Sequence, residues 1–387
     1  MITNITESIK YIGVDDMDLD LFESQYSIPN GMSYNSYVIF DDKTAILDSV
    51  DNRKCDEWLN NVNVVLQGKT PDYLIVHHME PDHIGSMLHL AEKYPTMQIV
   101  ASMRAVQMMP QFFHEADFSS RIIVVKEGDT LSLGKHTLNF FMAPMVHWPE
   151  VMVSYEQSEK ILFSADAFGK FGALSHQEEW DCEARRYYFN ICGKYGHQVQ
   201  TLLSKCSSLD IKIICPLHGP ILTDNLSHYI DLYNTWSKYE PETKGVFIAH
   251  ASIHGGTAHA ANLLAKMLRE KGEEKVVVTD LCRDDMAEAI EDAFRYDRIV
   301  VAASSYDANV FPPMHDFLHH LQLKNFQNRQ VGIIENGSWA PCAGRIMRSI
   351  LEQLKNIEII EPMLTIRSRI NPENMPTMKA LVDALTK

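Results

Sequence analysis

The second part of the chain alternates apolar strand-like runs with amphipathic helix-like segments. The strand-like runs are GVFIAH, KVVVTDL, DRIVVAASS and RQVGIIEN, and they are followed in turn by TAHAANLLAKMLREKG, DMAEAIEDAFRY, MHDFLHHLQLK and GRIMRSILEQL. Regular βαβ alternation joins parallel strands through crossover helices and is typical of a doubly wound parallel sheet. The sequence therefore predicts an α/β domain at residues 244–387.

The first part of the chain follows a different pattern. Its strand-like runs are paired across turns such as FDDKT and KEGDT, with helices interspersed, which favours a mixed or antiparallel sheet of α+β type. A chain of 387 residues can bury a separate core in each of two domains. We therefore place the domain boundary near Lys244, with one domain at 1–243 and another at 244–387.

Composition and charge exclude several classes of function. The net charge of -16 argues against nucleic acid or an anionic membrane surface as a partner. No apolar stretch approaches the roughly 18 to 20 residues that span a bilayer, and the start MITNITESIKYIGVDD lacks the pattern of a secretory signal. The seven cysteines include no C-x-x-C pair, which favours reduced thiols over disulfides. We expect a cytoplasmic location.

Metal-ligand side chains follow several strand-like runs of the first part. The run HMEPDH follows YLIV with only His77 between them, and three further candidates each follow another apolar run. The candidates are His78, Glu80, Asp82, His83, His147, Asp166 and His218. If these strands are neighbours in one sheet, their ends bring all seven side chains to one edge. By strand alternation, His77 points away from them. A lone His or Asp after a strand is usually a cap or turn residue, but the H-x-E-x-D-H run is a much stronger signal.

The residue types indicate a pair of metal ions. Imidazole and carboxylate together suit borderline first-row metals, and a carboxylate can bridge two ions where one imidazole nitrogen cannot. Seven ligands are too many for one tetrahedral ion, so a binuclear site is the economical interpretation.

Three loops at strand ends in the second part form a candidate cofactor site. The S-x-x-G-G-T turn exposes backbone N–H groups at a helix N-terminus, which suits a single phosphate. It lacks the motifs for nucleotide triphosphates and dinucleotides. The loops SSYDANVFPP and ENGSWAP supply aromatic rings that can flank a flat ring and backbone that can bond its polar edge. The candidates are Ser252, His254, Gly255, Gly256, Thr257, Ser305, Tyr306, Asp307, Asn309, Gly337, Ser338 and Trp339.

These motifs carry a resemblance to a known family. The H-x-E-x-D-H run with its later ligands resembles the metallo-β-lactamase fold, except that Glu80 replaces a usual His. The second part resembles flavodoxin, and its loops match the positions that hold flavin mononucleotide (FMN). Together they resemble the flavodiiron proteins, or A-type flavoproteins. The resemblance implies an αββα metallo-β-lactamase-like sandwich followed by a flavodoxin-like doubly wound sheet. It implies one iron on His78, Glu80 and His147, another on Asp82, His83 and His218, and Asp166 as the bridge. The Glu80 oxygen suits iron better than zinc.

The resemblance also implies an activity and partners. Members of the family relay electrons through FMN to two iron ions and reduce O2 to water or NO to nitrous oxide; we expect O2 first, with NO as a secondary or equal substrate. They are typically head-to-tail homodimers, or dimers of dimers, in which the flavin of one chain serves the iron of the other. Since no C-x-x-C pair follows the flavodoxin-like part, we expect a separate donor such as rubredoxin, a reductase or reduced deazaflavin. Trp148, Tyr187 and Tyr188 are candidate walls of the metal site, although they could equally be core residues.

Some features depart from the family pattern, and alternatives remain open. His254 and Gly256 stand where an aromatic residue and Asn are expected, and SSYDAN differs from the commoner S-P-T-Y-N-N run. The first alternative is a dizinc hydrolase of metallo-β-lactamase type. The second is a non-catalytic electron carrier with a degenerate metal domain. For the second part alone, the purely structural alternative is a flavodoxin-like scaffold that binds no flavin.

Overall fold

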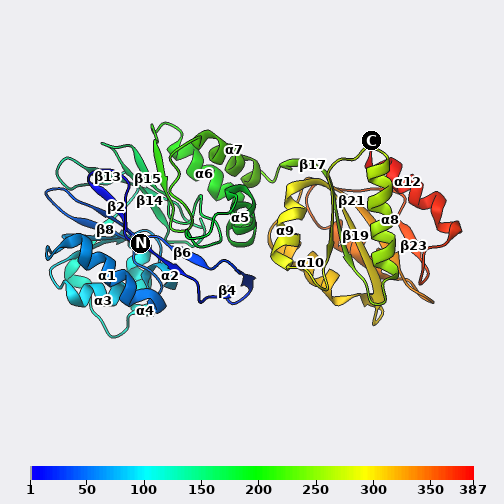
Figure 1. Cartoon of the computed structure of the whole chain (residues 1–387), viewed down its shortest axis with the longest axis horizontal. Helices are drawn as coiled ribbons and strands as arrows, with labels where there is room; N and C mark the ends of the chain where they lie inside the picture. The colour runs from blue at the N-terminus through cyan, green and yellow to red at the C-terminus, as the bar shows by residue number, and fades with distance from the viewer. Residues whose placement is uncertain (1) are drawn as a thin grey trace. The chain divides into compact units, whose positions relative to one another are not determined.

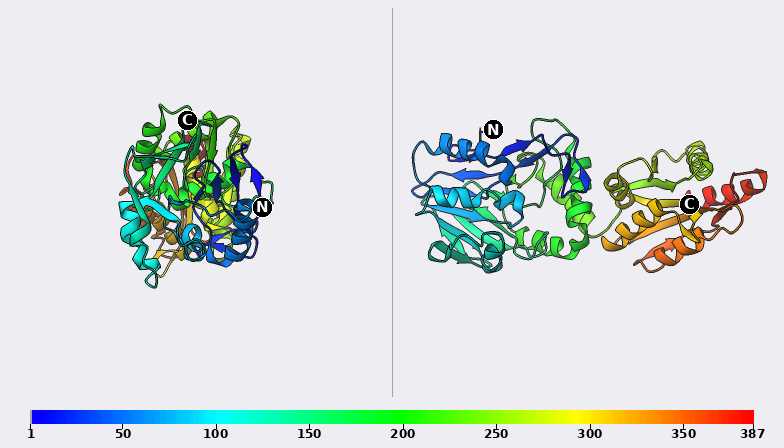
Figure 2. Two further views of the ribbon diagram at one scale, coloured as in Figure 1. Left: turned by 90° about the vertical axis from the view of Figure 1, so that its left-hand side faces the viewer. Right: turned by 90° about the horizontal axis from the view of Figure 1, so that it is seen from below.

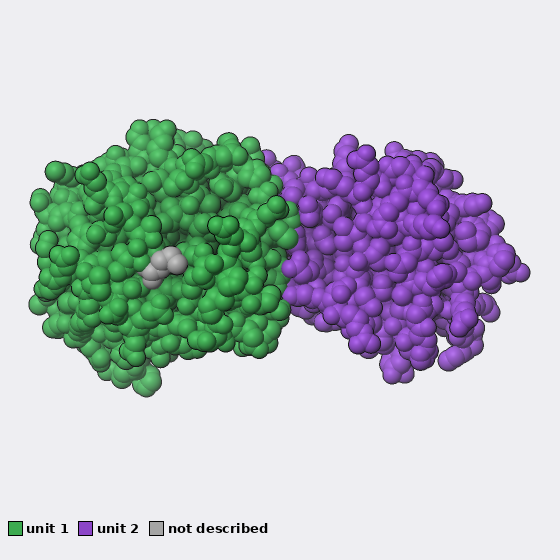
Figure 3. Space-filling view, in the orientation of Figure 1, with its two compact units in different colours: residues 1–188, 195–234 green, residues 189–194, 235–387 purple. Residues whose placement is uncertain are grey.

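The computed structural model describes residues 2–387, and these form two compact units (Figure 3). The first unit runs to Tyr188 and includes Tyr195–Asn234, whereas the second comprises Phe189–Lys194 and Thr235–Lys387. The second unit thus begins before residue 244 and takes in a short segment from earlier in the chain. Phe189 shows why, because its ring stacks on Phe294 of the second unit with centroids 4.3 Å apart.

The first unit contains two facing sheets. One sheet has the order β1-β2-β7-β8-β9-β10-β11 and the other β12-β13-β14-β15-β16. The strands of the first sheet are β1 Thr3–Asn4, β2 Ile9–Tyr11, β7 Tyr37–Ile39, β8 Ala45–Leu47, β9 Tyr73–Val76, β10 Gln98–Ser102 and β11 Ile122–Val125. Those of the second are β12 Thr130–Ser132, β13 Thr137–Met142, β14 Met152–Glu156, β15 Ile161–Phe163 and β16 Ile213–Cys215. Two small antiparallel pairs are β3 Val14–Asp16 with β6 Met32–Tyr34, and β4 Leu21–Phe22 with β5 Tyr26–Ser27.

A shared core joins the two sheets. Ile75 and Val100 of the first sheet belong to the same buried cluster as Phe140 and Phe163 of the second. Helices α1, α3 and α4 gather on one side of the unit and α5, α6 and α7 on another (Figure 1). The helices are α1 Cys55–Leu66, α2 Pro81–Ile84, α3 Met87–Lys93, α4 Met103–Phe112, α5 Trp180–Tyr187, α6 Gly196–Cys206 and α7 Leu226–Ser237. The predicted αββα sandwich is confirmed.

The second unit is a parallel sheet with the order β18-β17-β19-β21-β22, which is the doubly wound order of flavodoxin. Helices cover both faces of the sheet (Figure 1, Figure 2). The strands are β17 Thr243–Ala251, β18 Val276–Asp280, β19 Tyr296–Tyr306, β20 Asn309–Val310, β21 Arg329–Asn336, β22 Ile357–Ile359 and β23 Leu364–Ile366. The helices are α8 Gly256–Glu270, α9 Met286–Arg295, α10 Pro312–Leu323, α11 Ala343–Leu351 and α12 Met375–Leu385.

Packing explains the two helical layers of this unit. Residues of α8 and α12 share one buried cluster with alternate residues of the central strands, such as Val246 and Ile248. The intervening Phe247 contacts Phe317 of α10, with ring centroids 6.4 Å apart, on the other face of the sheet. Both faces of the central strands are therefore buried, as parallel sheets require. Among residues 2–387, no helix is both long and apolar enough to cross a bilayer.

Candidate metal centre and cofactor pocket

The seven predicted metal ligands come together at one end of the sandwich, but from two sheets. His78, Glu80, Asp82 and His83 follow β9 of the first sheet. In the second sheet, His147 lies between β13 and β14, Asp166 follows β15 and His218 follows β16. The expectation of a single sheet edge is therefore wrong. The two edges are joined where the Met152 N–H at the start of β14 donates to the His77 carbonyl oxygen at 3.1 Å. Facing sheets can place more ligands around one point than a single edge can.

A first ligand group consists of His78, Glu80, His147 and one oxygen of Asp166. Glu80 Oε2 lies 2.9 Å from His147 Nε2 and 3.2 Å from His78 Nε2. Asp166 Oδ2 lies 3.2 Å from His147 Nε2 and 3.3 Å from His78 Nε2. Two imidazole nitrogens and two carboxylate oxygens thus point at one small volume.

A second ligand group consists of Asp82, His83 and His218. His218 Nε2 lies 3.2 Å from Asp82 Oδ2, and His83 Nε2 lies 3.4 Å from Asp82 Oδ1. The other oxygen of Asp166, Oδ1, faces this group, at 3.1 Å from His83 Nε2 and 3.8 Å from His218 Nε2. The two oxygens of Asp166 therefore face different ligand groups, which is the geometry of a bridging carboxylate.

Buried polar atoms without hydrogen bonds test whether metal ions fit here. Among the described residues, both carboxylate oxygens of Asp82 and of Asp166, both ring nitrogens of His83 and His218 Nε2 lack a hydrogen bond of acceptable geometry. Leaving so many buried polar atoms unsatisfied is costly. Two cations among them would satisfy the carboxylate oxygens and the Nε2 atoms of His83 and His218, so the donor set fits a dinuclear site.

The electrostatics of the site favour positive charge. Burial alone would lower the pKa of His147, but the nearby carboxylates of Asp166 and Glu80 raise that pKa to about 9. Burial opposes ionisation of Glu80 and Asp166, yet the neighbouring imidazoles hold the pKa of both carboxyl groups below their ordinary values. The carboxylates stay ionised at neutral pH, and a metal cation would replace the protons on the histidines.

Two further groups orient the ligands. Glu150 is fully buried, and its Oε1 lies 2.8 Å from His78 Nδ1 and also accepts the Met79 N–H. The Ser33 carbonyl oxygen lies 2.7 Å from His218 Nδ1. A proton on each Nδ1 leaves each Nε2 lone pair facing the cluster. The sequence analysis did not identify either group; the only signal for Glu150 is its place three residues after His147.

Aromatic rings surround parts of the metal centre. Trp148 stands edge-on to His78, with centroids 5.3 Å apart and an interplanar angle of 88°. Tyr187 and Phe22 lie 5.5 and 5.6 Å from the His218 ring, respectively. Tyr188 packs against Tyr233 at 5.1 Å. Trp148 and Tyr187 thus contact the ligands directly.

His77 lies outside the ligand groups, as strand alternation predicts. Its Nδ1 lies 2.6 Å from Asp48 Oδ2, and its Nε2 lies 2.8 Å from Ser154 Oγ. All three side chains are buried, so this Ser–His–Asp arrangement has no access to a substrate. It joins the two sheets behind the metal centre.

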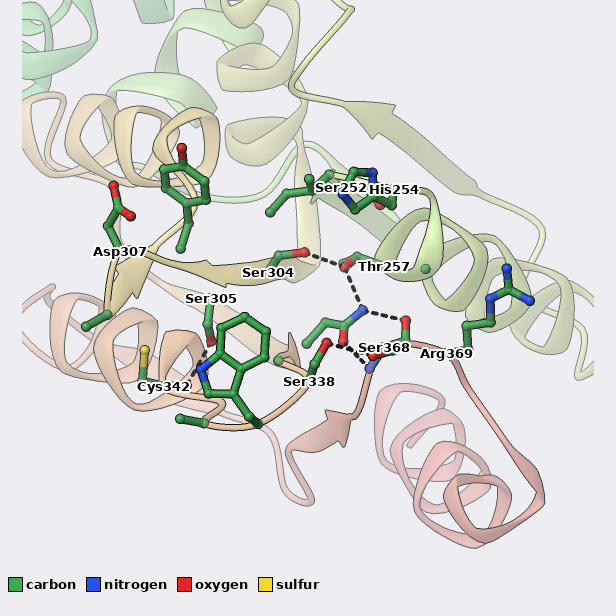
Figure 4. Close-up of a pocket in the computed structure, with 18 of the residues that line it drawn as sticks. Ser252, His254, Thr257, Ser304, Ser305, Asp307, Ser338, Cys342, Ser368 and Arg369 are labelled. Carbon is green, nitrogen blue, oxygen red and sulfur yellow. Dashed lines mark hydrogen bonds between the residues drawn. The ribbon is translucent and has the colours of Figure 1, made fainter.

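The three predicted loops of the second unit line a cavity of about 770 Å³ (Figure 4). This volume lies in the range of about 300 to 1,000 Å³ that is usual for small-molecule sites. Of the predicted residues, those that line it are Ser252, His254, Gly256, Thr257, Ser305, Tyr306, Asp307, Gly337, Ser338 and Trp339. Gly255 and Asn309 are chain neighbours of lining residues. Other lining residues include Asn336, Cys342, Arg345, Ser368 and Arg369, which the sequence analysis did not single out.

The loop after β19 has a local reason for its shape. Asp307 and Ala308 adopt φ of 50° and 57° and form the tip of the β19–β20 hairpin. Ser305 Oγ accepts hydrogen bonds from the N–H groups of Cys342 and Ala343 at 2.8 and 3.1 Å. These bonds tie the SSYDANVFPP loop to the start of α11.

A flat ring carrying a phosphate fits this cavity. Trp339 is 89% exposed and Tyr306 is 46% exposed, so both rings have free faces at its rim. Ser252 Oγ is buried and has no hydrogen-bond partner among the described residues. It lies in the 252–257 loop at the N-terminus of α8, where backbone N–H groups favour an anion. The residues present therefore fit a phosphorylated flavin.

Comparisons with known proteins agree with this geometry. The family described as "ODP family beta lactamase" matches residues 32–219. A nitric oxide reductase from Moorella thermoacetica is 30% identical over 381 residues, covering 94% of this chain and 92% of that protein. An anaerobic nitric oxide reductase flavorubredoxin from Salmonella typhi is 26% identical over 348 residues, covering 87% of this chain and 72% of its own.

Solved structures share the whole fold. A rubredoxin oxygen:oxidoreductase from Desulfovibrio gigas superposes with a TM-score of 0.92 at 25% identity, covering 100% of this chain and 98% of its own. A flavodiiron protein from Giardia intestinalis reaches 0.91 at 22% identity, covering 100% and 96%. With the ligand groups, the flavin-type cavity and these likenesses in place, this chain belongs to the flavodiiron protein family.

Proposed function

We propose that this protein is a cytoplasmic oxidoreductase that reduces O2 to water and NO to nitrous oxide. The relatives named for nitric oxide reduction and for oxygen reduction support both substrates. The observation that carries the proposal is the position of Glu80 within the first ligand group, 2.9 Å from His147 Nε2. A carboxylate at this position favours iron, which changes oxidation state, over zinc.

The residues of the chain prepare the site for this reaction. In the proposal, His78, Glu80 and His147 would hold one iron, Asp82, His83 and His218 would hold the other, and Asp166, with one oxygen facing each group, would be shared between them. Bound iron would supply open positions for a diatomic, and FMN in the cavity of the second unit would supply electrons. Glu150 and the Ser33 carbonyl hold the imidazoles in their metal-facing tautomers. Trp148 and Tyr187 limit the access of water.

The proposal includes partners. A head-to-tail homodimer, or a dimer of dimers, would bring the flavin of one chain to the iron centre of another. Electrons would come from a separate donor such as rubredoxin or a reductase. With a net charge of -16 the chain offers no general attraction to an acidic donor, so docking would use a local surface.

An anaerobic assay tests the function. Iron, zinc and flavin are quantified per chain, and the reduced protein is then followed for consumption of O2 and NO in parallel. We expect iron and flavin, with loss of both gases, and we expect His147→Ala to abolish turnover. His89→Ala, which alters an exposed histidine of α3, should leave turnover unchanged. Zinc without flavin would instead support the hydrolase alternative.

A further inference from the structure

The turn Arg367–Arg369, which follows β23, lies against the loop where the flavin phosphate would bind. The Ser368 carbonyl oxygen lies 2.1 Å from the position that a Cβ atom on Gly256 would occupy. No side chain fits at residue 256, which accounts for glycine where the family pattern has Asn. The turn therefore occupies space that a side chain of the 252–257 loop would otherwise take.

Hydrogen bonds fix this turn from two directions. The buried Asn336 accepts the Ser368 N–H at 2.9 Å and donates its Nδ2 to the Ser368 carbonyl at 3.1 Å. The same Nδ2 lies 3.3 Å from Thr257 Oγ1, and Ser338 Oγ lies 2.7 Å from Ser368 Oγ (Figure 4). These hydrogen bonds fix the position of the turn relative to both the 252–257 loop and the ENGSWAP loop.

The two arginines of the turn differ in their relation to the cavity. Ser368 adopts φ of 66°, and the Arg369 N–H donates back to the Arg367 carbonyl at 2.9 Å, so the chain reverses between them. Arg369 lines the cavity, and Arg367 is not among the lining residues that the structure describes. Figure 4 places Arg369 on the α8 side of the cavity, and Asp307 lies at the opposite end.

We propose that Arg369 provides the positive charge that makes this cavity select a phosphorylated flavin over an unphosphorylated one. The inference rests on the proposed binding of flavin. A phosphate monoester carries about -1.5 to -2 charges at neutral pH, and a chain of net charge -16 repels it at long range. The α8 N-terminus offers only partial positive charge, and Arg345, the other arginine that lines the cavity, belongs to α11 rather than to the turn against the 252–257 loop. A guanidinium on the α8 side of the cavity adds a full charge and two parallel donors for phosphate oxygens.

The test compares FMN with riboflavin, which differs from FMN only in lacking the phosphate. The full-length protein is stripped of flavin, and each flavin is titrated by quenching of its fluorescence, with the wild type and with Arg369→Gln and Arg367→Gln. We expect Arg369→Gln to weaken FMN binding about tenfold and to leave riboflavin binding unchanged. Arg367→Gln removes the same charge from the same turn and should retain nearly wild-type affinity for both. Raising the salt to about 1 M should shrink the effect of Arg369→Gln.

The outcomes separate the inference from the function on which it rests. If the wild type prefers FMN but the two variants bind it equally, backbone N–H groups alone hold the phosphate, and the role of Arg369 is refuted while flavin binding stands. If Arg369→Gln weakens both flavins equally, Arg369 acts on the ring or the fold, which also refutes the inference. If the wild type binds neither flavin, the proposed function fails with it.

Discussion

At the scale of single residues, Glu150 controls the direction of His78. Glu150 is fully buried. Its Oε1 lies 2.8 Å from His78 Nδ1 and accepts the Met79 N–H at 2.8 Å. Glu150→Gln keeps an acceptor but removes the charge that makes the ring a stronger ligand. Partners of this kind change metal affinity by about 10- to 100-fold. We expect iron binding, measured by competition with a chelator, to weaken by about tenfold.

The control for this variant is Glu115→Gln, which changes an exposed glutamate outside the ligand groups. It should bind iron as the wild type does. Unchanged affinity in Glu150→Gln would show that the neutral amide orients His78 as well as the carboxylate does.

Gly256 is the second residue whose identity has a direct structural reason. Any Cβ at this position meets the Ser368 carbonyl, which is backbone and cannot rotate away. Overpacking of this kind costs about 1 to 3 kcal/mol, so Gly256→Ala should lower the free energy of unfolding by that amount. The larger Gly256→Asn should cost more and should also weaken FMN binding by displacing the turn. Denaturant unfolding measures the first effect, and wild-type stability in both variants would contradict the close approach.

At the scale of elements, Asp41 connects the two sheets of the first unit. It lies between β7 and β8 and accepts the backbone N–H of His136, from the turn between β12 and β13, at 2.7 Å. Burial raises the pKa of Asp41, but hydrogen bonds from His136 and from the Asp42 N–H outweigh it and lower the pKa to about 2. Its carboxylate therefore stabilises the fold above the ordinary carboxyl pKa, and this contribution is lost as the pH falls through about 2.

Asp41→Asn should accordingly reduce stability most at neutral pH. We expect the free energy of unfolding to fall by about 1 kcal/mol at neutral pH, and the difference from wild type to narrow as the medium is acidified. Urea unfolding of the metal-free protein across this pH range measures it. Asp42→Asn removes the same charge one residue along and is the control. A difference that stays constant with pH would exclude the carboxylate as its source.

The elements also show which features a sequence can predict. The run from His78 to His83 is local, and the residue types in it indicate a metal site without knowledge of the fold. The βαβ pattern after Gly245 is equally local, and its predicted strands and helices are confirmed. Glu150 and the Ser33 carbonyl act only because two sheets face each other, and a one-dimensional pattern does not contain that approach. The same holds for the turn at Ser368, whose carbonyl lies against Gly256 although more than a hundred residues separate the two in the chain.

At the scale of the whole molecule, the position of the domain boundary has a measurable consequence. The sequence places the boundary at residue 244, yet Trp236 and Tyr239 belong to the second unit and are buried. The Tyr239 carbonyl accepts Arg329 Nη1 at 2.7 Å. Arg329 is 2% exposed, and burial lowers its pKa to about 10. A buried guanidinium that loses an acceptor is strongly destabilising.

Two fragments of the chain test this boundary. Residues 235–387 keep Trp236, Tyr239 and the acceptor for Arg329, whereas residues 244–387 lose all three. Removing a buried aromatic side chain alone costs about 3 to 5 kcal/mol, so the shorter fragment should unfold at clearly lower denaturant. Both retain every residue that lines the flavin cavity, so FMN titration of whichever fragments fold is the control for the pocket. Equal stability of the two fragments would place the boundary near residue 244. A less stable long fragment would mean that residues 235–243 fold only with Phe189–Lys194 or with the first unit, both of which the two fragments lack.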